Sequence, residues 1–234
     1  MKTGILVPLP QELLSLTNIR MIQGSCTALT DHLIICLTGI GRDQTGLGFE
    51  HLIRHGAQWL ISWGSAAGLF PGLNAGDLLI PESIRIEHRE FETSNPYNQR
   101  IISGLPHSIT LHRGPMVETR KILATVEDKK QLFAISGCKA ADMESGALAQ
   151  LATENNIPFS VVRAVSDPVD LVLPGSLLGS FVHGTFQPLT LMSRAITKPD
   201  DWVAIAKLMS GFKKAKKTLR VVGELIKTHS DKWT

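Results

Sequence analysis

The sequence predicts an α/β fold with a mostly parallel sheet that is buried on both faces. Short apolar, β-branched runs alternate with helical stretches, as they do in βαβ crossover units. Glycine- and serine-containing turns follow two of these runs, at the sheet edge where α/β folds bind ligands. A chain of 234 residues with 43% hydrophobic residues is long enough for one large core, so we expect one domain over residues 1–234.

Each element follows from a local pattern, in chain order. Apolar runs predict buried strands at 3–9, 32–38, 59–63 and 159–165. A strand pair kinked at Pro81 is expected over 77–87. Helical patterns are expected at 11–19, 43–55, 119–132 and 144–155.

The last part of the chain predicts a basic amphipathic helix near 202–228. Its apolar residues recur at spacings of three and four, from Ile205 to Ile226, and lysines occupy the other face. Residues 198–234 hold nine Lys or Arg and four Asp or Glu, a net charge of +5, which leaves −2 for the rest. The stretch near 168–200, rich in Pro, Gly and Ser, is expected to be a lid or insertion.

Composition excludes several classes of protein. Charged residues make up 19% of the chain, no window is apolar enough to span a membrane, and the first apolar run is too short for a signal peptide. The main body is not basic, so we expect no nucleic-acid partner. Cys26, Cys36 and Cys138 lack close spacing, which argues against a disulfide framework and a cysteine zinc site. We expect a soluble protein of a reducing compartment, the cytoplasm.

Three motifs resemble known sites only in part. The turn Gly39-Ile40-Gly41 lacks the rest of a dinucleotide fingerprint, so a tight turn is favoured, with Arg42 as a weak candidate phosphate contact. The segment 64–68 is not a nucleophile elbow, but its N–H groups and hydroxyl suit a ligand. His51 and His55 lack the glutamate of a zinc protease motif, and we expect no metal.

Three acids occupy the predicted ligand edge. Glu12 follows the first strand, Glu144 opens a helix, and Asp167 follows the strand 159–165. Each has an ordinary alternative explanation, as an acid in a first helical turn or as a turn residue. At the end of a buried strand, however, a partly desolvated carboxyl group has a raised pKa, which suits Asp167 to general acid catalysis.

These segments, in this order, resemble the purine nucleoside phosphorylase and methylthioadenosine/S-adenosylhomocysteine nucleosidase superfamily from residue 1 to about 170. The resemblance is carried by Glu12, Gly39-Ile40-Gly41, Gly64-Ser65-Ala66-Ala67-Gly68-Leu69, Ala75-Gly76-Asp77-Leu78, Asp142-Met143-Glu144 and the strand that ends in Ser166-Asp167. The stretch 163–170, Leu173-Pro174 and the basic tail look most like the hopanoid-associated phosphorylase subgroup, thought to remove adenine from adenosylhopane. The resemblance implies a three-layer α/β/α sandwich with a central mixed, mostly parallel sheet.

The resemblance also implies cleavage of the bond between a purine and ribose. Asp167 would protonate or hydrogen-bond purine N7, Glu144 would bind the ribose hydroxyls, and Glu12 would activate water if the reaction is hydrolytic. The further substrate-binding residues that it implies are Gly64, Ser65, Ala66, Met116, Val117, Met143 and Ser166.

Two departures from the family leave the nucleophile open between phosphate and water. Asp142 stands where nucleosidases carry Glu, and the arginines of phosphate-using relatives are replaced near Pro10 and Trp63. No cofactor is implied. The alternatives are a soluble methylthioadenosine/S-adenosylhomocysteine nucleosidase, a general purine nucleoside phosphorylase, and a non-catalytic nucleoside-binding protein. We expect a homo-oligomer, and a lipid-linked nucleoside as substrate would favour contact of the basic helix with the inner membrane face.

Overall fold

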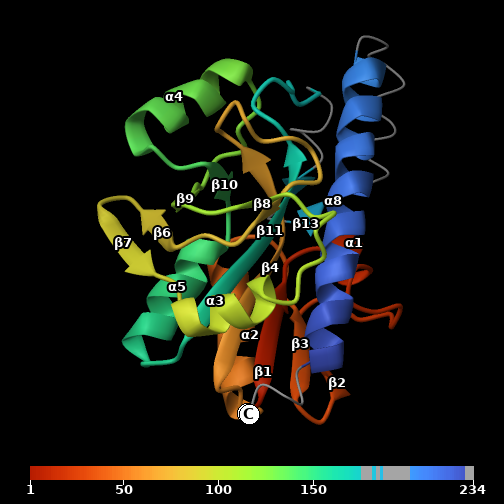
Figure 1. Ribbon diagram of the computed structural model, residues 1–234, viewed down its shortest axis with the longest axis vertical. Helices are drawn as coiled ribbons and strands as arrows, with labels where there is room; N and C mark the ends of the chain where they lie inside the picture. The colour runs from red at the N-terminus through yellow and green to blue at the C-terminus, as the bar shows by residue number, and fades with distance from the viewer. Residues whose placement is uncertain (175–180, 183–184, 187–200, 230–234) are drawn as a thin grey trace.

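The computed structural model describes residues 1–174, 181–182, 185–186 and 201–229 (Figure 1). Over these residues the framework is an 11-stranded sheet in which six of the ten strand pairings are parallel. The sheet strands are β1 (Thr3–Val7), β2 (Cys26–Thr30), β3 (Leu33–Leu37), β4 (Trp59–Gly68), β5 (Leu78–Leu79), β6 (Ser83–Ile86), β7 (Arg89–Glu92), β8 (Leu111–His112), β9 (Met116–Glu118), β10 (Ala140–Asp142) and β11 (Phe159–Asp167). A separate pair joins β12 (Phe181–Val182) and β13 (Thr185–Phe186).

Helices cover both faces of the sheet, which confirms the predicted mixed α/β sandwich. On one face, α2 (Arg42–Arg54) and α5 (Ser145–Glu154) contribute Phe49, Leu52 and Leu148 to one apolar cluster. On the other, α1 (Pro10–Leu13), α3 (Asn95–Ile102) and α8 (Asp201–His229) pack into a second cluster, to which α8 contributes Leu219 and Val222. In Figure 1, α8 runs as one straight blue helix beside β11.

The predicted strands and helices form at most of the expected places, since their apolar patterns fit the observed burial. The helix expected at 11–19 is an exception, because only the short α1 at Pro10–Leu13 forms and a turn follows it. β1, β3 and β11 are buried along their whole length. The basic amphipathic helix expected near 202–228 is α8, with Ala215 and Ile226 on its buried side. The lid expected near 168–200 lies mostly outside the described residues. Within that stretch the structure describes residues 168–174 and the two short strands β12 and β13.

Strand β4 runs through the site, and along one of its edges the paired strand changes from β1 to β10. Its first part pairs in parallel with β1, up to the Leu6–Ser62 pair, and its last part pairs antiparallel with β10, from Ala67 onward. β11 lies along its other edge and pairs with it from Leu60 to Ala67. The segment 64–68, expected as a turn after a shorter strand, therefore continues β4 through the gap between β1 and β10.

The helix expected at 119–132 starts later than the sequence indicated. The structure has α4 at Val126–Ser136, because Thr125 caps it: Thr125 Oγ1 accepts from Asp128 N at 3.0 Å, and Asp128 Oδ2 accepts from Thr125 N at 3.2 Å. Residues 119–124 form a loop instead. This difference matters because that loop lines the cavity described below.

The cysteines also differ from expectation. Cys26 and Cys36 are register partners in the antiparallel pair β2–β3 and form one disulfide, with Cα atoms 4.0 Å apart. Their separation in sequence hid this, since only strand pairing brings them together. Cys138 is free and buried.

Candidate active site

A cavity of about 530 Å³ opens where the carboxyl ends of β1, β10 and β11 meet around β4. It is lined by Pro8, Leu9, Glu12, Ile40, Ser65, Ala66, Ala67, Thr119, Arg120, Lys121, Ile122, Leu123, Ala141, Asp142, Met143, Glu144, Ser166, Asp167, Leu173, Leu208 and Phe212. The three carboxylates singled out by the sequence, Glu12, Glu144 and Asp167, all belong to this lining and are 6%, 8% and 8% exposed. They come from three separate strand ends, and the fold brings them to one place.

Glu12 is held against the open stretch of β4. Its Oε1 accepts hydrogen bonds from Ser65 N and Ser65 Oγ, each at 2.7 Å, and its Oε2 accepts from Leu9 N at 3.2 Å. Ser65 lies in the gap between β1 and β10, so its N–H is available to a side chain. Burial raises the pKa of Glu12, while the hydrogen bonds from Ser65 and the charge of Arg163 oppose that rise.

Glu144 sits between β10 and α5, with its Oε1 accepting from Gly41 N at 3.1 Å. Burial, reinforced by the charge of Asp142, raises the pKa of Glu144 to about 8. Asp142 itself forms a buried salt bridge with Arg163, 2.6 Å from Nη2. Arg163 also donates to Ser62 Oγ at 2.7 Å, so the partners of this guanidinium are other side chains of the protein.

Asp167 ends β11. Its Oδ1 accepts from Ser166 Oγ at 2.7 Å, and its Oδ2 lies 3.1 Å from Lys129 Nζ. Burial raises the pKa of Asp167, and the nearby Lys129 charge partly offsets this. A carboxyl group that holds its proton more firmly is suited to donate it at neutral pH.

The other predicted substrate contacts divide into two groups. Ser65, Ala66, Met143 and Ser166 line the cavity. Gly64 lies behind the Glu12 carboxylate, where an added Cβ would be 2.8 Å from Glu12 Oε1. Met116 and Val117 do not line it: they are buried in β9, and the loop that follows them, 119–123, forms the wall.

Arg42, the candidate phosphate contact, is directed elsewhere. It is the first residue of α2, and its Nε lies 3.4 Å from Glu118 Oε1 while Nη2 donates to Gln150 Oε1 at 3.1 Å. Glu118 also accepts from Ala147 N at 2.7 Å, at the start of α5, and burial raises the pKa of Glu118 to about 7. Arg42 therefore links the start of α2 to β9 and to the middle of α5, and it is not among the lining residues.

Sequence reasoning missed two kinds of site residue. Lys129 and Arg163 are charged yet fully buried. Nothing in the local sequence of Lys129 separates it from a surface residue, whereas Arg163 lies within the predicted buried strand 159–165 and its position there was the signal that was overlooked. The apolar wall, made by Ile122, Leu173, Leu208 and Phe212, comes from three distant segments. The stepped apolar stripe of α8 was the only signal for the last two. Within the described ranges, no cluster of three metal-ligating side chains is present and no helix has the length and apolarity to cross a bilayer.

A model of the phosphorylase superfamily matches residues 16–177, which is most of the chain. The chain therefore belongs to this superfamily of nucleoside phosphorylases and nucleosidases, as its sequence motifs indicated. The matched stretch contains Glu144 and Asp167, whereas Glu12 precedes it.

Individual relatives agree with the family. The chain is 27% identical over 154 residues to a 5′-methylthioadenosine/S-adenosylhomocysteine nucleosidase of Staphylococcus aureus, covering 57% of this chain and 68% of that protein. Its fold is similar to the nucleosidase of that name from Neisseria meningitidis, solved with methylthio-immucillin-A, with a TM-score of 0.71 at 19% identity over 97% of this chain and 99% of the other. The futalosine hydrolase of Helicobacter pylori is also similar, with a TM-score of 0.67 at 18% identity over 95% and 97%.

Proposed function

We propose that this protein is an enzyme that releases adenine from an adenine nucleoside by cleaving the N-glycosidic bond. The observation that carries the proposal is the meeting of Glu12, Glu144 and Asp167 in one cavity, each buried and each held by hydrogen bonds. The reaction builds positive charge on the ribose and negative charge on the base. Carboxyl groups on both sides of the breaking bond oppose these charges, as they do in glycosidases.

Each acid has a role that follows from its surroundings. Asp167 donates its proton to purine N7, so that the base leaves neutral, and its raised pKa supports this role. Glu144 binds the ribose hydroxyls, with Met143 packed against the ring. Its ionised form, the minor one at neutral pH because its pKa is about 8, stabilises the cationic sugar. Glu12 has a second acceptor position on Oε2, where it can bind and deprotonate a nucleophile.

We further propose that the nucleophile is water. Phosphate would need free cations near Glu12. Arg163, whose charge acts on Glu12, is bound to Asp142 and Ser62, and Arg42 is bound to Glu118 and Gln150. The charge of each arginine is therefore paired with a carboxylate of the protein and is not available to bind phosphate, which favours hydrolysis over phosphorolysis.

The apolar wall supports a nucleoside whose 5′ substituent is apolar. Ile122, Leu173, Leu208 and Phe212 form a small cluster that is separate from the main cores and borders the cavity. Such a wall binds apolar groups through burial. Adenosylhopane, which the resemblance implies, is our first candidate substrate. Methylthioadenosine and S-adenosylhomocysteine, after which the similar nucleosidases of Staphylococcus aureus and Neisseria meningitidis are named, are the second.

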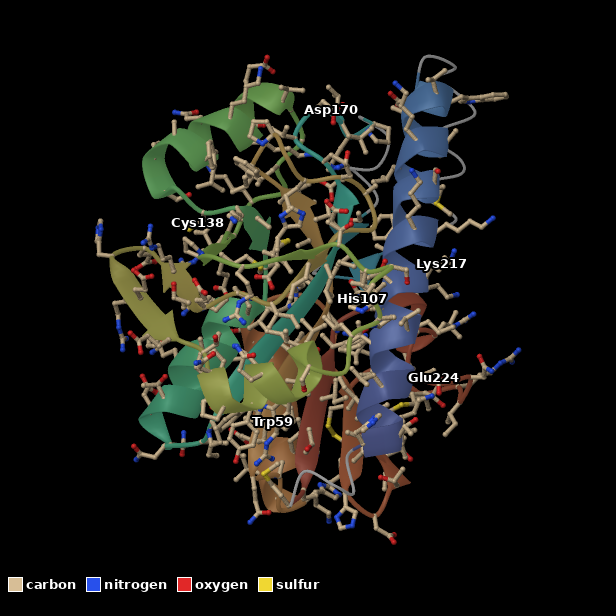
Figure 2. The ribbon with its side chains drawn as sticks, viewed as in Figure 1. Trp59, His107, Cys138, Asp170, Lys217 and Glu224 are labelled. Atoms are coloured by element: carbon tan, nitrogen blue, oxygen red, sulfur yellow. A yellow bond between two sulfur atoms is a disulfide. The ribbon has the colours of Figure 1, made fainter. Side chains whose placement is uncertain are left out.

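A lipid-linked substrate would be reached at a membrane surface, and α8 has features that suit this. Lys213, Lys214 and Lys217 are exposed on it, and Trp202 and Met209 are each 60% exposed toward its amino end. Figure 2 shows Lys217 and Glu224 on this helix. We expect the protein to float with anionic vesicles, and a variant with Lys213, Lys214, Lys216 and Lys217 changed to Gln to float less; equal flotation would exclude this role.

The function is tested by incubating the purified protein with adenosine, methylthioadenosine, S-adenosylhomocysteine and adenosylhopane, with and without phosphate. We expect adenine from at least one of them at a rate that does not depend on phosphate, with a free sugar as the other product. A sugar 1-phosphate that forms only with phosphate would contradict hydrolysis and leave the cleavage itself supported. Absence of adenine from all four would contradict the function.

A further inference from the structure

Lys129 is a buried charged residue to which the proposed reaction has so far given no role. It lies in the first turns of α4, and its side chain is fully buried. Removing an ammonium group from water is costly unless the group is fully paired. The charge of Lys129 must therefore be compensated by nearby polar or acidic groups.

Four oxygen atoms surround Lys129 Nζ. The distances are 2.9 Å to Pro168 O, 3.0 Å to Leu171 O, 3.1 Å to Asp167 Oδ2 and 3.3 Å to Asp167 O. An ammonium has three protons, and the two shortest contacts are to the carbonyls of Pro168 and Leu171. The third proton is shared between the carbonyl and the carboxyl group of Asp167, so the carboxyl group can still hold a proton of its own.

The two oxygens of Asp167 are thus held from different elements. Lys129, from α4, contacts Oδ2, and Ser166, from β11, donates to Oδ1. Within the described part of the chain, these are the side chains bonded to Asp167. Of the other ionisable groups of the site, Glu12 on α1, Asp142 and Glu144 ahead of α5, and Arg163 on β11 have other partners. Arg120 and Lys121 line the cavity from the loop after β9, and Arg120 pairs with Glu87.

We propose that Lys129 is a positioning residue that acts through Asp167: it fixes the carboxyl group toward the base and stabilises the carboxylate left after proton transfer. This rests on the function proposed above. In that reaction the proton moves from Asp167 to N7, the electron pair of the C1′–N9 bond moves into the base, and the negative charge remains on Asp167. A fixed cation at 3.1 Å opposes the cost of that charge in a site shielded from water.

The test is a double-mutant cycle of wild type, Lys129→Met, Asp167→Asn and the double variant, with kcat and KM measured for adenine release. We expect Lys129→Met to lower kcat by about tenfold to 100-fold while KM changes by less than about threefold. In the Asp167→Asn background, the same change is expected to alter kcat by less than about twofold, because Lys129 then has no carboxylate to act on. Equal losses in both backgrounds would overturn the proposal.

A pH profile separates this role from a purely structural one. Loss of the cation removes the largest effect that opposes burial and leaves the hydrogen bond from Ser166, so the pKa of Asp167 rises and activity in Lys129→Met should persist to higher pH than in wild type. A structural defect would lower the whole profile without moving it. Lys130→Met is the matched control: Lys130 is the next residue on α4 and is exposed, and we expect no change in either measurement.

Two further outcomes are distinguishable. If Lys129→Met does not fold, Lys129→Gln replaces it, since its amide can still donate to the carbonyls of Pro168 and Leu171 without carrying charge. If the wild type releases no adenine from any nucleoside, the proposed function fails and this role fails with it. An active wild type with additive losses in the cycle contradicts the role of Lys129 alone.

Discussion

Ser65 donates two hydrogen bonds to the same oxygen of Glu12, one from its backbone N–H and one from its hydroxyl, each 2.7 Å long. The backbone donor is available because β4 has no strand partner on that edge between Ser62 and Ala67. The unpaired stretch of β4 therefore binds and orients the carboxylate of Glu12. Because such a carboxylate keeps its acceptor positions oriented before substrate arrives, the fold itself supplies part of the preorganisation that catalysis needs.

The first prediction concerns the close approach of β4 to Glu12. In Gly64→Ala, the new Cβ would lie 2.8 Å from Glu12 Oε1 and 2.9 Å from its carboxyl carbon, so the carboxylate must move. We expect kcat/KM for adenine release to fall by about 100-fold, since small displacements of a catalytic group carry large costs. Gly46→Ala is the control, because a Cβ at Gly46 meets no atom within 4 Å. Unchanged activity in Gly64→Ala would mean that the position of Glu12 does not matter to the reaction.

The second prediction concerns the proton donor. Asp167→Asn keeps the size of the side chain but removes the acidic proton, so we expect kcat to fall by about 10²–10⁴-fold. Asp170→Asn is the matched control, since Asp170, labelled in Figure 2, is exposed in the loop that follows β11. Adenine release should be measured together with thermal unfolding, because the variant leaves Lys129 without its carboxylate. Adenine release at the wild-type rate would remove Asp167 from the mechanism.

The elements that could be predicted are those whose signal is local. The strands β1, β3 and β11 are runs of apolar residues, and α2 and α8 have helical spacing, so burial and periodicity were sufficient. Glu12 and Asp167 could be expected near each other, because β1 and β11 both run parallel to β4 and end at the same edge. Glu144 follows β10, which runs antiparallel to β4, so only the fold shows how it reaches the same cavity. What these features share is that a window of about ten residues contains the information.

The remainder depended on contacts between distant segments. The partners of Lys129 and Arg163, which are Asp167 and Asp142, lie far from them in sequence, so a sequence window contains one partner of each pair and cannot show how the buried charge is compensated. The start of α4 was misplaced because the loop 119–124 has no strong helix-breaking residue, and Thr125 determined the boundary. The continuation of β4 through 64–68 was hidden because glycine and serine there are typical of turns.

The third prediction is a pH dependence of stability. The pKa of Glu144 is raised from 4.5 to about 8 in the folded protein, so between these values the folded state binds a proton that the unfolded state has lost. Stability is therefore greatest below about pH 4.5 as far as Glu144 is concerned, and it falls as the pH rises through about 8. One unit of pKa shift corresponds to about 1.4 kcal/mol in the free energy of unfolding, so Glu144 can change that free energy by at most several kcal/mol between the two pH limits.

Urea unfolding of the protein at pH 5 and pH 9 measures this effect. We expect wild type to lose stability between the two values and Glu144→Gln to lose less, because its amide can still accept from Gly41 N and carries no charge. Glu118, whose pKa is about 7, contributes in the same direction and remains in both proteins. Glu154→Gln, at an exposed position on α5, should behave as wild type. An identical loss in wild type and Glu144→Gln would show that Glu144 is ionised in the folded state.

The last prediction concerns substrate choice. Phe212 and Leu208 face the cavity from α8, and they pack with Leu173 in a cluster of their own. A 5′-methylthio group reaching this wall would gain apolar contact that the 5′-hydroxyl of adenosine would not. Phe212→Ala should therefore lower kcat/KM for methylthioadenosine by about tenfold, in the range for loss of one apolar contact, and should affect adenosine by less than about threefold.

The comparison of the two nucleosides gives this prediction its specificity. A general disturbance of the site would lower both values equally, whereas loss of an apolar contact affects only the substrate that makes it. Met209→Ala provides the control on the same helix, because Met209 is 60% exposed and does not line the cavity. Equal losses for both nucleosides in Phe212→Ala would mean that the apolar wall supports the fold of the site and leaves the choice of 5′ substituent to other residues.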